Sequence, residues 1–277
     1  MQEISTLEEL LRWRKSQTQS IGFVPTMGAL HEGHLSLLTQ SRLSCDITVA
    51  SIFVNPLQFS LGEDFDAYPR STQADREICE ANGCDVLFLP SASEMYPQGL
   101  ERLTKVIGRA EMSNCLCGLS RPGHFEGVLT VVLKLFNLLM PHKAFFGEKD
   151  FQQLRLIESL VEDFNLNIQV VRCPTVRLPS GLAMSSRNKY LTESEKQEAS
   201  HLYATLKTAE NAILKGSPVN QVINELRQSH FEYFEARDPD TMMLTDKLPA
   251  RLFIAAKVGK ARLIDNLEIT AHPEHCK

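Results

Sequence analysis

The sequence predicts an α/β fold, with a doubly wound parallel sheet followed by a smaller α+β domain. Two observations lead to this prediction. Short apolar, β-branched runs of strand length alternate with segments of helical periodicity up to about residue 175. After that point two helical segments follow one another, and the strands come last. Alternating strands and helices build a parallel sheet with helices on both faces. We therefore expect a first domain over residues 1–175 and a second over residues 176–277.

The first elements are a short amphipathic helix over Leu7–Lys15, with a hydroxyl-bearing cap before it, and a strand over Ile21–Val24. Pro25 and Gly28 are expected to break this strand. Leucines at helical spacing follow the break. This stretch is therefore predicted to form a strand, a loop and a helix.

Two histidines, His31 and His34, lie at the start of that helix, with Gly33 between them. Unpaired N–H groups and the positive end of the helix dipole favour an anion there, most often a phosphate. The spacing places both imidazoles on one side of the helix, and the glycine leaves room for a ligand. Two other interpretations stay open from these residues alone. They are a pair of capping or solvated histidines, and a metal pair that would need further ligands.

The alternation continues with an almost continuous apolar run over Ile47–Val54, which is typical of a strand buried on both faces. In doubly wound sheets, ligands bind beyond the carboxyl ends of the strands. We therefore expect Asn55 and Gln58, and further on Tyr68 and Arg70, in the same crevice as the histidines. The other elements expected in the first domain are helices over 71–81 and 128–140, a loop over 120–127, and strands over 85–89, 144–146 and 167–171.

A second passage from strand to glycine to helix contains Gly147 and Lys149. A lysine in the first turn of a helix is unfavourable by about a few tenths of a kcal/mol, so its presence suggests a bound anion. Asp150 and Gln153 have the spacing of a capping box, in which both side chains would satisfy backbone N–H groups. Binding of a ligand by Gln153 is the competing interpretation.

The second domain begins with a loop over Arg177–Leu191 that contains a glycine, several hydroxyl groups and two arginines. Such a loop can wrap phosphates. Helices are expected over 193–215 and, with Pro218 in its first position, from 218 to about 233. Strands over 251–257 and 261–264, separated by a glycine turn, are expected to form a hairpin.

The 277 residues carry a formal net charge of −5 without a basic run, which argues against a nucleic-acid partner. No apolar run approaches the roughly 20 residues that span a bilayer, and the first residues do not resemble a signal peptide. We therefore expect a cytoplasmic protein without a membrane partner. The 7 cysteines contain no Cys-x-x-Cys pair, so mostly buried, reduced thiols are expected. For the close pair Cys115 and Cys117, a metal or redox role is the alternative.

Six spaced motifs resemble the pantothenate synthetases (pantoate–β-alanine ligases), a family of the nucleotidylyl-transferase superfamily. One motif is Pro25-Thr-Met-Gly-Ala-Leu-His-Glu-Gly-His34, whose last four residues match the His-x-Gly-His nucleotide site of that superfamily. The other motifs are residues 51–59, 66–70, 121–125, 146–150 and 184–188. The resemblance implies a Rossmann-like first domain and ATP-dependent condensation of pantoate with β-alanine. The products would be pantothenate, AMP and pyrophosphate, formed through a pantoyl-adenylate. The resemblance also implies Mg²⁺ and a homodimer.

The resemblance further implies which residues act. The catalytic residues would be His31, His34, Lys149, Ser185, Ser186 and Arg187. ATP would be bound by Met27, His34, Gly147, Lys149, Asp150, Val176, Met184, Ser185, Ser186 and Arg187. Pantoate would be bound by Met27, Asn55, Gln58 and Gln153. Mg²⁺ would sit largely on phosphate oxygens, with Asp150 as a candidate ligand. No nucleophilic side chain is expected, because the pantoate carboxylate itself attacks the α-phosphate.

Two other functions are compatible with parts of this pattern. One is another adenylyl transferase of the superfamily, which would transfer AMP without requiring both pantoate and β-alanine. The other is a non-catalytic nucleotide-binding module, which would bind ATP without exchanging pyrophosphate into it. The presence of both histidines and of Lys149 argues against the second function.

Overall fold

The computed structural model describes residues 1–60, 63, 65–66 and 68–270. Its contacts fall into two compact units. Unit 1 comprises residues 1–148 and 153–174, and unit 2 comprises residues 149–152 together with the chain from 175 onward.

Unit 1 is built on a six-stranded sheet in which all the strand pairs are parallel. The strand order is β1-β4-β3-β2-β5-β6. The strands are β1 (Gln2–Ile4), β2 (Ile21–Thr26), β3 (Ile47–Ile52), β4 (Val86–Phe88), β5 (Lys143–Gly147) and β6 (Gln169–Cys173). The doubly wound parallel sheet predicted from the sequence is therefore confirmed.

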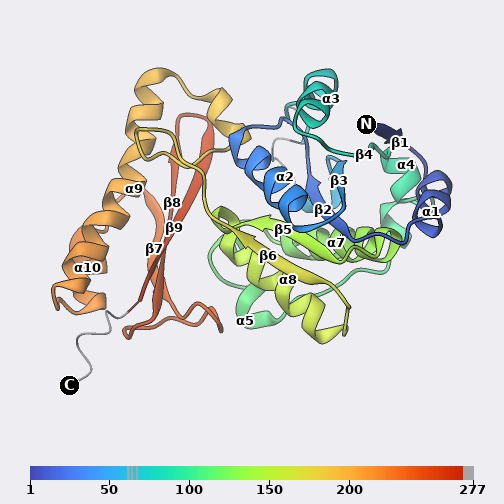
Figure 1. Cartoon of the computed structure of the whole chain (residues 1–277). Helices are drawn as coiled ribbons and strands as arrows, with labels where there is room; N and C mark the ends of the chain where they lie inside the picture. Colours follow the sequence, from blue (N-terminus) through green and yellow to red (C-terminus); the bar gives the residue numbers. More distant parts are fainter. Residues whose placement is uncertain (61–62, 64, 67, 271–277) are drawn as a thin grey trace. The chain divides into compact units, whose positions relative to one another are not determined.

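Helices cover both faces of this sheet (Figure 1). In Figure 1, α2 and α3 lie on one side of the sheet and α7 and α8 on the other, and α2 contacts β2, β3, β5 and β6. The helices are α1 (Leu7–Lys15), α2 (Glu32–Ser44), α3 (Thr72–Ala81), α4 (Ala92–Met95), α5 (Ala110–Ser113), α6 (Cys117–Ser120), α7 (His124–Leu139) and α8 (Phe151–Asp163). Short 3₁₀ turns are η1 (Pro56–Gln58), η2 (Leu100–Arg102) and η3 (Glu148–Asp150).

Several details of unit 1 differ from the sequence prediction, and one is that the strand predicted over 167–171 lies two residues later, as β6. Strand β1 was not predicted, because two of its three residues are polar and form no apolar run, and pairing with β4 defines it. Strand β2 continues through Pro25 to Thr26, because the ladder with β5 ends at Phe23 and no N–H group is needed beyond it. Helix α7 begins at His124, within the expected loop.

Gly127 explains why α7 can begin early. The residue lies inside the helix against η1, and a Cβ built on it would come within 2.3 Å of the Leu57 carbonyl oxygen. The glycine therefore does not break the helix but lets its backbone approach the segment that follows β3.

The turn between β2 and α2 has a left-handed backbone at two consecutive residues, Gly28 (φ +83°) and Ala29 (φ +52°). The N–H groups of Ala29 and Leu30 both donate to the carboxylate of Asp75 on α3, at 2.8 Å each. Asp75 is only 1% exposed. Hydrogen bonds to a charged acceptor are stronger than neutral ones, so a buried carboxylate holds this turn.

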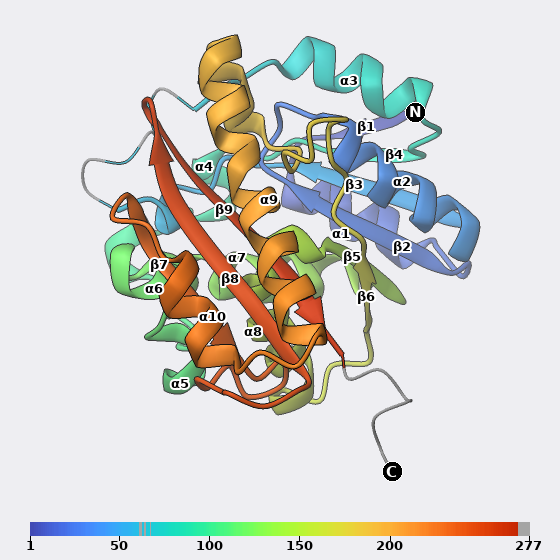
Figure 2. The ribbon, with the colours of Figure 1, turned by 90° about the vertical axis from the view of Figure 1, so that its left-hand side faces the viewer.

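Unit 2 contains the antiparallel sheet β7-β8-β9, with α9 and α10 lying across it (Figure 2). Its elements are η4 (Ser186–Tyr190), α9 (Glu193–Leu214), α10 (Val219–Leu226), β7 (Phe231–Arg237), β8 (Ala250–Val258) and β9 (Ala261–Ile269). The predicted hairpin is confirmed as β8 and β9. The helix predicted to reach about residue 233 ends at Leu226, and Pro218 is its N-cap rather than its first residue. The residues that follow form β7, because their aromatic side chains pack into the core of the sheet.

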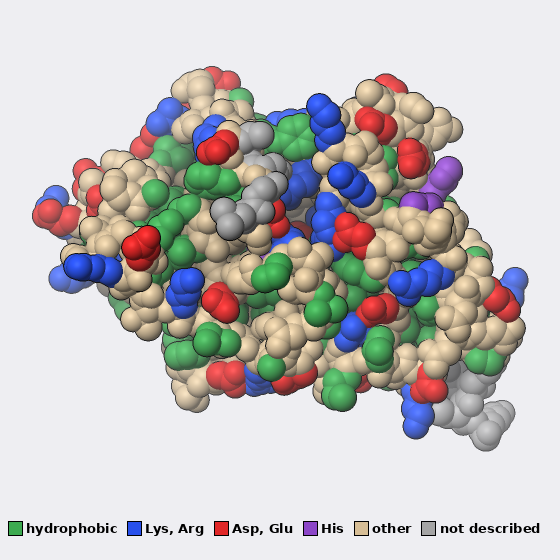
Figure 3. All heavy atoms as spheres, turned by 180° about the vertical axis from the view of Figure 1, so that it is seen from behind, with side chains coloured by type: hydrophobic (Ala, Val, Ile, Leu, Met, Phe, Trp, Pro, Cys, Tyr) green, Lys and Arg blue, Asp and Glu red, His purple; other side chains and the backbone are tan. Residues whose placement is uncertain are grey.

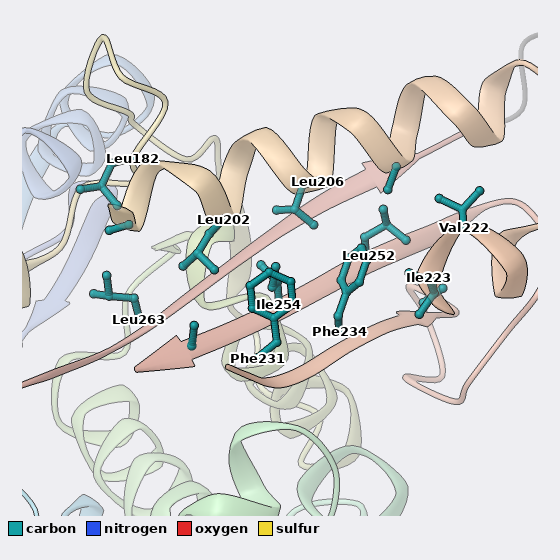
Figure 4. Packing of buried hydrophobic residues seen from close by; sticks show 14 of the residues in the cluster. Leu182, Leu202, Leu206, Val222, Ile223, Phe231, Phe234, Leu252, Ile254 and Leu263 are labelled. Carbon is teal, nitrogen blue, oxygen red and sulfur yellow. The ribbon is translucent and has the colours of Figure 1, made fainter. Parts of the chain in front are cut away.

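An apolar cluster holds the helices of unit 2 on the sheet (Figure 4). Leu202 and Leu206 of α9 point toward Leu252 and Ile254 of β8, beside Phe234 of β7. Four of these five side chains are fully buried, and burying one such side chain stabilises a fold by about 1.5–3 kcal/mol. Unit 2 therefore has a hydrophobic core of its own.

Acidic, basic and apolar side chains are interspersed on the face of the molecule seen in Figure 3. No helix of the described part of the chain is both long and apolar enough to cross a bilayer. All cysteines within the described residues have free thiols, and all of these except Cys45 are buried, as predicted. Cys276 lies outside the described residues.

We predict that Asp75→Asn lowers the free energy of unfolding by about 1–3 kcal/mol, because the amide leaves one of the two buried N–H groups of the turn without an acceptor. Urea denaturation followed by circular dichroism measures this change. Glu77→Gln removes the same charge from α3 at a position outside the core and should cost no more than about 0.5 kcal/mol. Equal stability of the two variants would contradict the prediction.

Candidate active site

Unit 1 reverses its strand order at β2 and β5. Strand β2 connects through α2 to β3 on one side, and β5 connects through α8 to β6 on the other. Ligands of doubly wound sheets bind at the carboxyl ends of the strands at such a reversal. Met27 directly follows β2, and Gly147 is the last residue of β5. The carboxyl ends of β2 and β5 are therefore the expected binding edge of unit 1.

The two histidines cap α2 with one ring nitrogen each. His31 is the N-cap residue, and its Nδ1 accepts a hydrogen bond from the Gly33 N–H at 3.1 Å. Nδ1 of His34 accepts from the His31 N–H at 3.3 Å, and the ring centroids lie 4.1 Å apart. A neutral imidazole that accepts at Nδ1 carries its hydrogen on Nε2. The capping interpretation and the anion-binding interpretation are thus compatible, because capping uses Nδ1 and places an N–H donor at Nε2.

Three of the residues expected to bind pantoate lie together in unit 1. Asn55 Nδ2 donates to Gln58 Oε1 at 3.1 Å, and Gln58 Nε2 donates to Met27 Sδ at 2.9 Å. Asn55 and Gln58 are only 1% and 7% exposed. The bond from Gln58 to Met27 therefore joins the segments after β2 and β3, and the two buried side-chain amides with the Met27 thioether form what we call the amide cluster. The fourth residue, Gln153, is half-buried on α8.

Two residues that the sequence did not suggest hold Asn55 in place. Tyr96 Oη donates to Asn55 Oδ1 at 2.8 Å, and burial raises the pKa of the Tyr96 phenol, which keeps it a donor. Asn55 Nδ2 also donates to the carbonyl oxygen of Gly127 at 3.1 Å. Nothing in the local sequence around Tyr96 marks it, because its partner lies 41 positions away along the chain.

A charged pair holds the backbone of Gln58. Arg121 donates to both carboxylate oxygens of Glu63 at 2.7 Å, and it also donates to the Gln58 carbonyl oxygen at 3.4 Å. His124 Nδ1 lies 2.8 Å from the same carbonyl oxygen. Burial raises the pKa of the Glu63 carboxyl, but the bond and the charge of Arg121 outweigh burial and lower it overall. Arg121 and His124 thus shape the cluster through the backbone.

The two further residues expected near the crevice have structural contacts of their own. Tyr68 is buried, and its ring packs edge-on against Phe59. Arg70 donates to the carbonyl oxygens of Phe65 and Asp66, at 3.0 and 3.2 Å, and so fixes the loop before it. Ala67, which belongs to the 66–70 motif, lies outside the described residues.

Three of the expected ATP-binding residues, Met27, His34 and Gly147, lie in unit 1, and all the others lie in unit 2. Lys149 Nζ lies 3.4 Å from Asp150 Oδ1, and both residues belong to η3. Ser185 is the N-cap of η4, and its Oγ accepts from the Arg187 N–H at 3.3 Å. Ser186 is 7% exposed. The expected phosphate loop is therefore a capped 3₁₀ turn.

The last two expected ATP-binding residues, Val176 and Met184, are paired through the extended backbone that precedes η4. The N–H group of Met184 donates to the carbonyl oxygen of Val176 at 2.9 Å. An isolated antiparallel bridge joins Arg177 and Ala183 directly inside this pair. The loop predicted over 177–191 thus begins as a narrow turn.

Metal binding by protein ligands alone has no support within the described residues. No group of three or more His, Cys, Asp or Glu side chains gathers there in a way that could hold a metal ion. This argues against the metal interpretation of the His31–His34 pair and of Cys115 and Cys117, since closed metal sites need about four ligands.

Comparisons with known proteins point to one family. The family model described as pantoate-beta-alanine ligase matches residues 1–268. A bifunctional pantoate ligase/cytidylate kinase of Synechococcus elongatus is 49% identical over 279 residues, which cover 97% of this chain. Those residues are 53% of that relative, so the chain spans about half of its length.

Solved structures agree with the family model. Pantothenate synthetase from Thermus thermophilus has a TM-score of 0.92 and 40% sequence identity, covering 98% of this chain and 100% of that chain. A pantoate-beta-alanine ligase from Francisella tularensis, in complex with beta-gamma ATP and beta-alanine, has a TM-score of 0.81 and 40% identity, with 97% of each chain covered. The chain therefore belongs to the pantoate–β-alanine ligase family.

Proposed function

We propose that the chain condenses pantoate with β-alanine at the expense of ATP, giving pantothenate, AMP and pyrophosphate through a pantoyl-adenylate. The observation that carries this proposal is the arrangement after β2 and β3. There the Met27–Gln58–Asn55 amide cluster and two histidines with Nε2 donors occur in one compact unit. The Francisella tularensis relative, described in complex with beta-gamma ATP and beta-alanine, supports the choice of substrates.

The amide cluster is assigned to pantoate. Gln58 and Gln153 can bind hydroxyl and carboxylate groups, because a side-chain amide both donates and accepts hydrogen bonds. Asn55 lines the pocket and orients Gln58, since its own amide is held by Tyr96 and Gly127. Met27 then lies beside the acid that is activated.

The donors and cations are assigned to ATP. When the pantoate carboxylate attacks the α-phosphate, negative charge builds on the phosphoryl oxygens and on the departing pyrophosphate. Preorganised donors stabilise that charge. The catalytic donors are His31, His34, Lys149, Ser185, Ser186 and Arg187, and the other ATP contacts are Met27, Gly147, Asp150, Val176 and Met184. The substrate supplies the nucleophile, so no Ser, Cys or His nucleophile is required.

A divalent cation fits this set of residues only when it binds together with the phosphates of ATP. The described residues hold no cluster of three or more ligating side chains, and Mg²⁺ prefers phosphate oxygens, waters and one or two carboxylates. Asp150 is the residue that would contribute a carboxylate. When bound, Mg²⁺ would neutralise charge on the phosphates.

Three further assignments belong to the same proposal. Residues 1–175 are the nucleotide- and pantoate-binding domain, and residues 176–277 are the small domain that carries the Met184–Asn188 segment. The chain forms a homodimer, as the family resemblance implies. It acts in the cytoplasm, which the free thiols of the described residues support.

We predict pantoate-dependent exchange of labelled pyrophosphate into ATP in the absence of β-alanine, because adenylation precedes amide formation. AMP release should require both pantoate and β-alanine. Transfer of AMP to a mononucleotide would instead support another adenylyl transferase. ATP binding without any exchange would support a non-catalytic module.

We predict that His31→Asn lowers the exchange rate by about 10²- to 10³-fold while α2 stays folded. Asparagine is a favoured N-cap residue, so the helix keeps its cap, but the Nε2 donor is lost. Exchange kinetics and thermal unfolding measure the two effects. His201→Asn, at an exposed position of α9, serves as the control and should be neutral. Normal exchange by His31→Asn would refute the donor assignment.

We predict that Gly127→Ala raises the pantoate concentration for half-maximal exchange about tenfold and leaves that of ATP unchanged. The new methyl group collides with the backbone of Leu57 and Gln58, and overpacking of this kind costs about 1–3 kcal/mol. Alanine otherwise favours a helix by about 1 kcal/mol over glycine. A more stable variant with unchanged pantoate dependence would therefore show that the collision is relieved elsewhere.

A further inference from the structure

Two consecutive residues of β9, Asp265 and Asn266, are polar and almost fully buried, each with 4% exposure. Buried polar side chains of this kind need hydrogen-bond partners, and the partners show what these residues hold. Successive side chains of a strand point to opposite faces of the sheet. The two residues can therefore anchor segments on opposite faces.

Asn266 anchors the segment that contains Lys149. Its Nδ2 donates to the Lys149 carbonyl oxygen at 2.9 Å, and its Oδ1 accepts from Arg251 Nη1 at 2.7 Å. The Arg251 guanidinium also stacks on the ring of Phe151, 3.6 Å from the centroid. Asn266 and Arg251 thus hold this short segment on either side of Asp150. The bond from Asn266 uses the backbone of Lys149 and not its Nζ, which lies 3.4 Å from Asp150 Oδ1.

Asp265 anchors the segment that leads to the Ser185 turn. Its carboxylate accepts from Arg177 Nη1 and Nη2, at 2.6 and 2.8 Å. The same guanidinium donates to the Gly181 carbonyl oxygen at 3.0 Å and stacks on the ring of Tyr203, 3.7 Å from its centroid. Arg177 therefore fixes the narrow turn over 177–183 that leads directly into Ser185.

The two residues are also hydrogen-bonded to each other, because the N–H group of Asn266 donates to Asp265 Oδ1 at 2.8 Å. One strand thereby fixes two segments that lie far apart in the sequence. Replacing buried ionic groups by apolar ones of similar size is often neutral or stabilising. Stability alone therefore does not require this network.

We propose that Asp265 and Asn266 are positioning residues for ATP binding, with Asn266 placing Lys149 and Asp265 placing the Ser185–Arg187 turn. This inference rests on the proposed function, in which those two segments bind ATP phosphates. Neither positioning residue touches ATP.

The test is a double-mutant cycle on ATP affinity, measured by isothermal titration calorimetry with Mg²⁺ and ATP on the full chain. Asn266→Asp keeps the acceptor for Arg251 but places a carboxylate oxygen against the Lys149 carbonyl, and it should weaken ATP binding about tenfold. Lys149→Ala should weaken it as well. The double variant should bind no more weakly than Lys149→Ala alone, because both changes act through the same ammonium group.

The matched control is Glu268→Gln, which alters another partner of Arg251 on the same strand but touches neither ATP-binding segment. It should leave ATP affinity unchanged. Additive effects in the cycle, an unchanged affinity in Asn266→Asp, or an equal loss in Glu268→Gln would overturn the proposal.

Folding and function are separated by two further measurements. If Asn266→Asp does not fold, the same affinity measurement is made on Asp265→Asn, which tests the Ser185 segment. If neither variant folds, the two residues have a purely structural role and the proposal is overturned. A wild-type chain that binds ATP without pantoate-dependent exchange would refute the proposed function yet leave the cycle interpretable. A wild-type chain that binds no ATP would refute both.

Discussion

The turn between β2 and α2 depends on one buried carboxylate. Asp75 accepts hydrogen bonds from the N–H groups of Ala29 and Leu30, and both would otherwise lack a partner away from water. The left-handed backbone at Gly28 and Ala29 is therefore stabilised by a residue of α3. This turn determines where the chain leaves the sheet at Met27 and where His31 caps the start of α2. The positions of the polar groups at the end of β2 thus depend on the hydrogen bonds to Asp75, which lies 45 or 46 positions further along the chain.

Helix capping and the proposed ligand binding involve different atoms of the same side chains. His31 and His34 satisfy backbone N–H groups through Nδ1, which fixes the tautomer and the ring orientation. A histidine that accepts at Nδ1 in this way carries its hydrogen on Nε2, and preorganised donors stabilise developing charge better than flexible ones. In the proposed function, the same two residues would therefore both cap the helix and donate to the phosphates.

Sequence patterns sufficed for β2 to β6, the first helix and the β8–β9 hairpin, because each of these elements coincides with an apolar run or a periodic segment. It did not show β1, which exists only through pairing with β4, and it extended the last helix across Phe231, where packing against α9 and α10 favours a strand. Motifs indicated His31, Gln58 and Lys149. The residues that support them could not be predicted, because Asp75, Tyr96 and Asn266 act on partners between 41 and 117 positions away.

Both units keep their candidate binding residues on buried polar networks rather than on apolar packing alone. In unit 1, Tyr96 holds Asn55 and Asn55 holds Gln58, while in unit 2 Asn266 and Asp265 hold two segments from one strand. Apolar side chains can repack with small shifts, whereas a hydrogen bond weakens steeply once its geometry departs from the optimum. In the proposed reaction, negative charge builds on the phosphoryl oxygens and on the departing pyrophosphate, and donors held in fixed positions stabilise it better than mobile ones. The polar networks supply that constraint, and the apolar cluster under α9 supplies the stability that they do not.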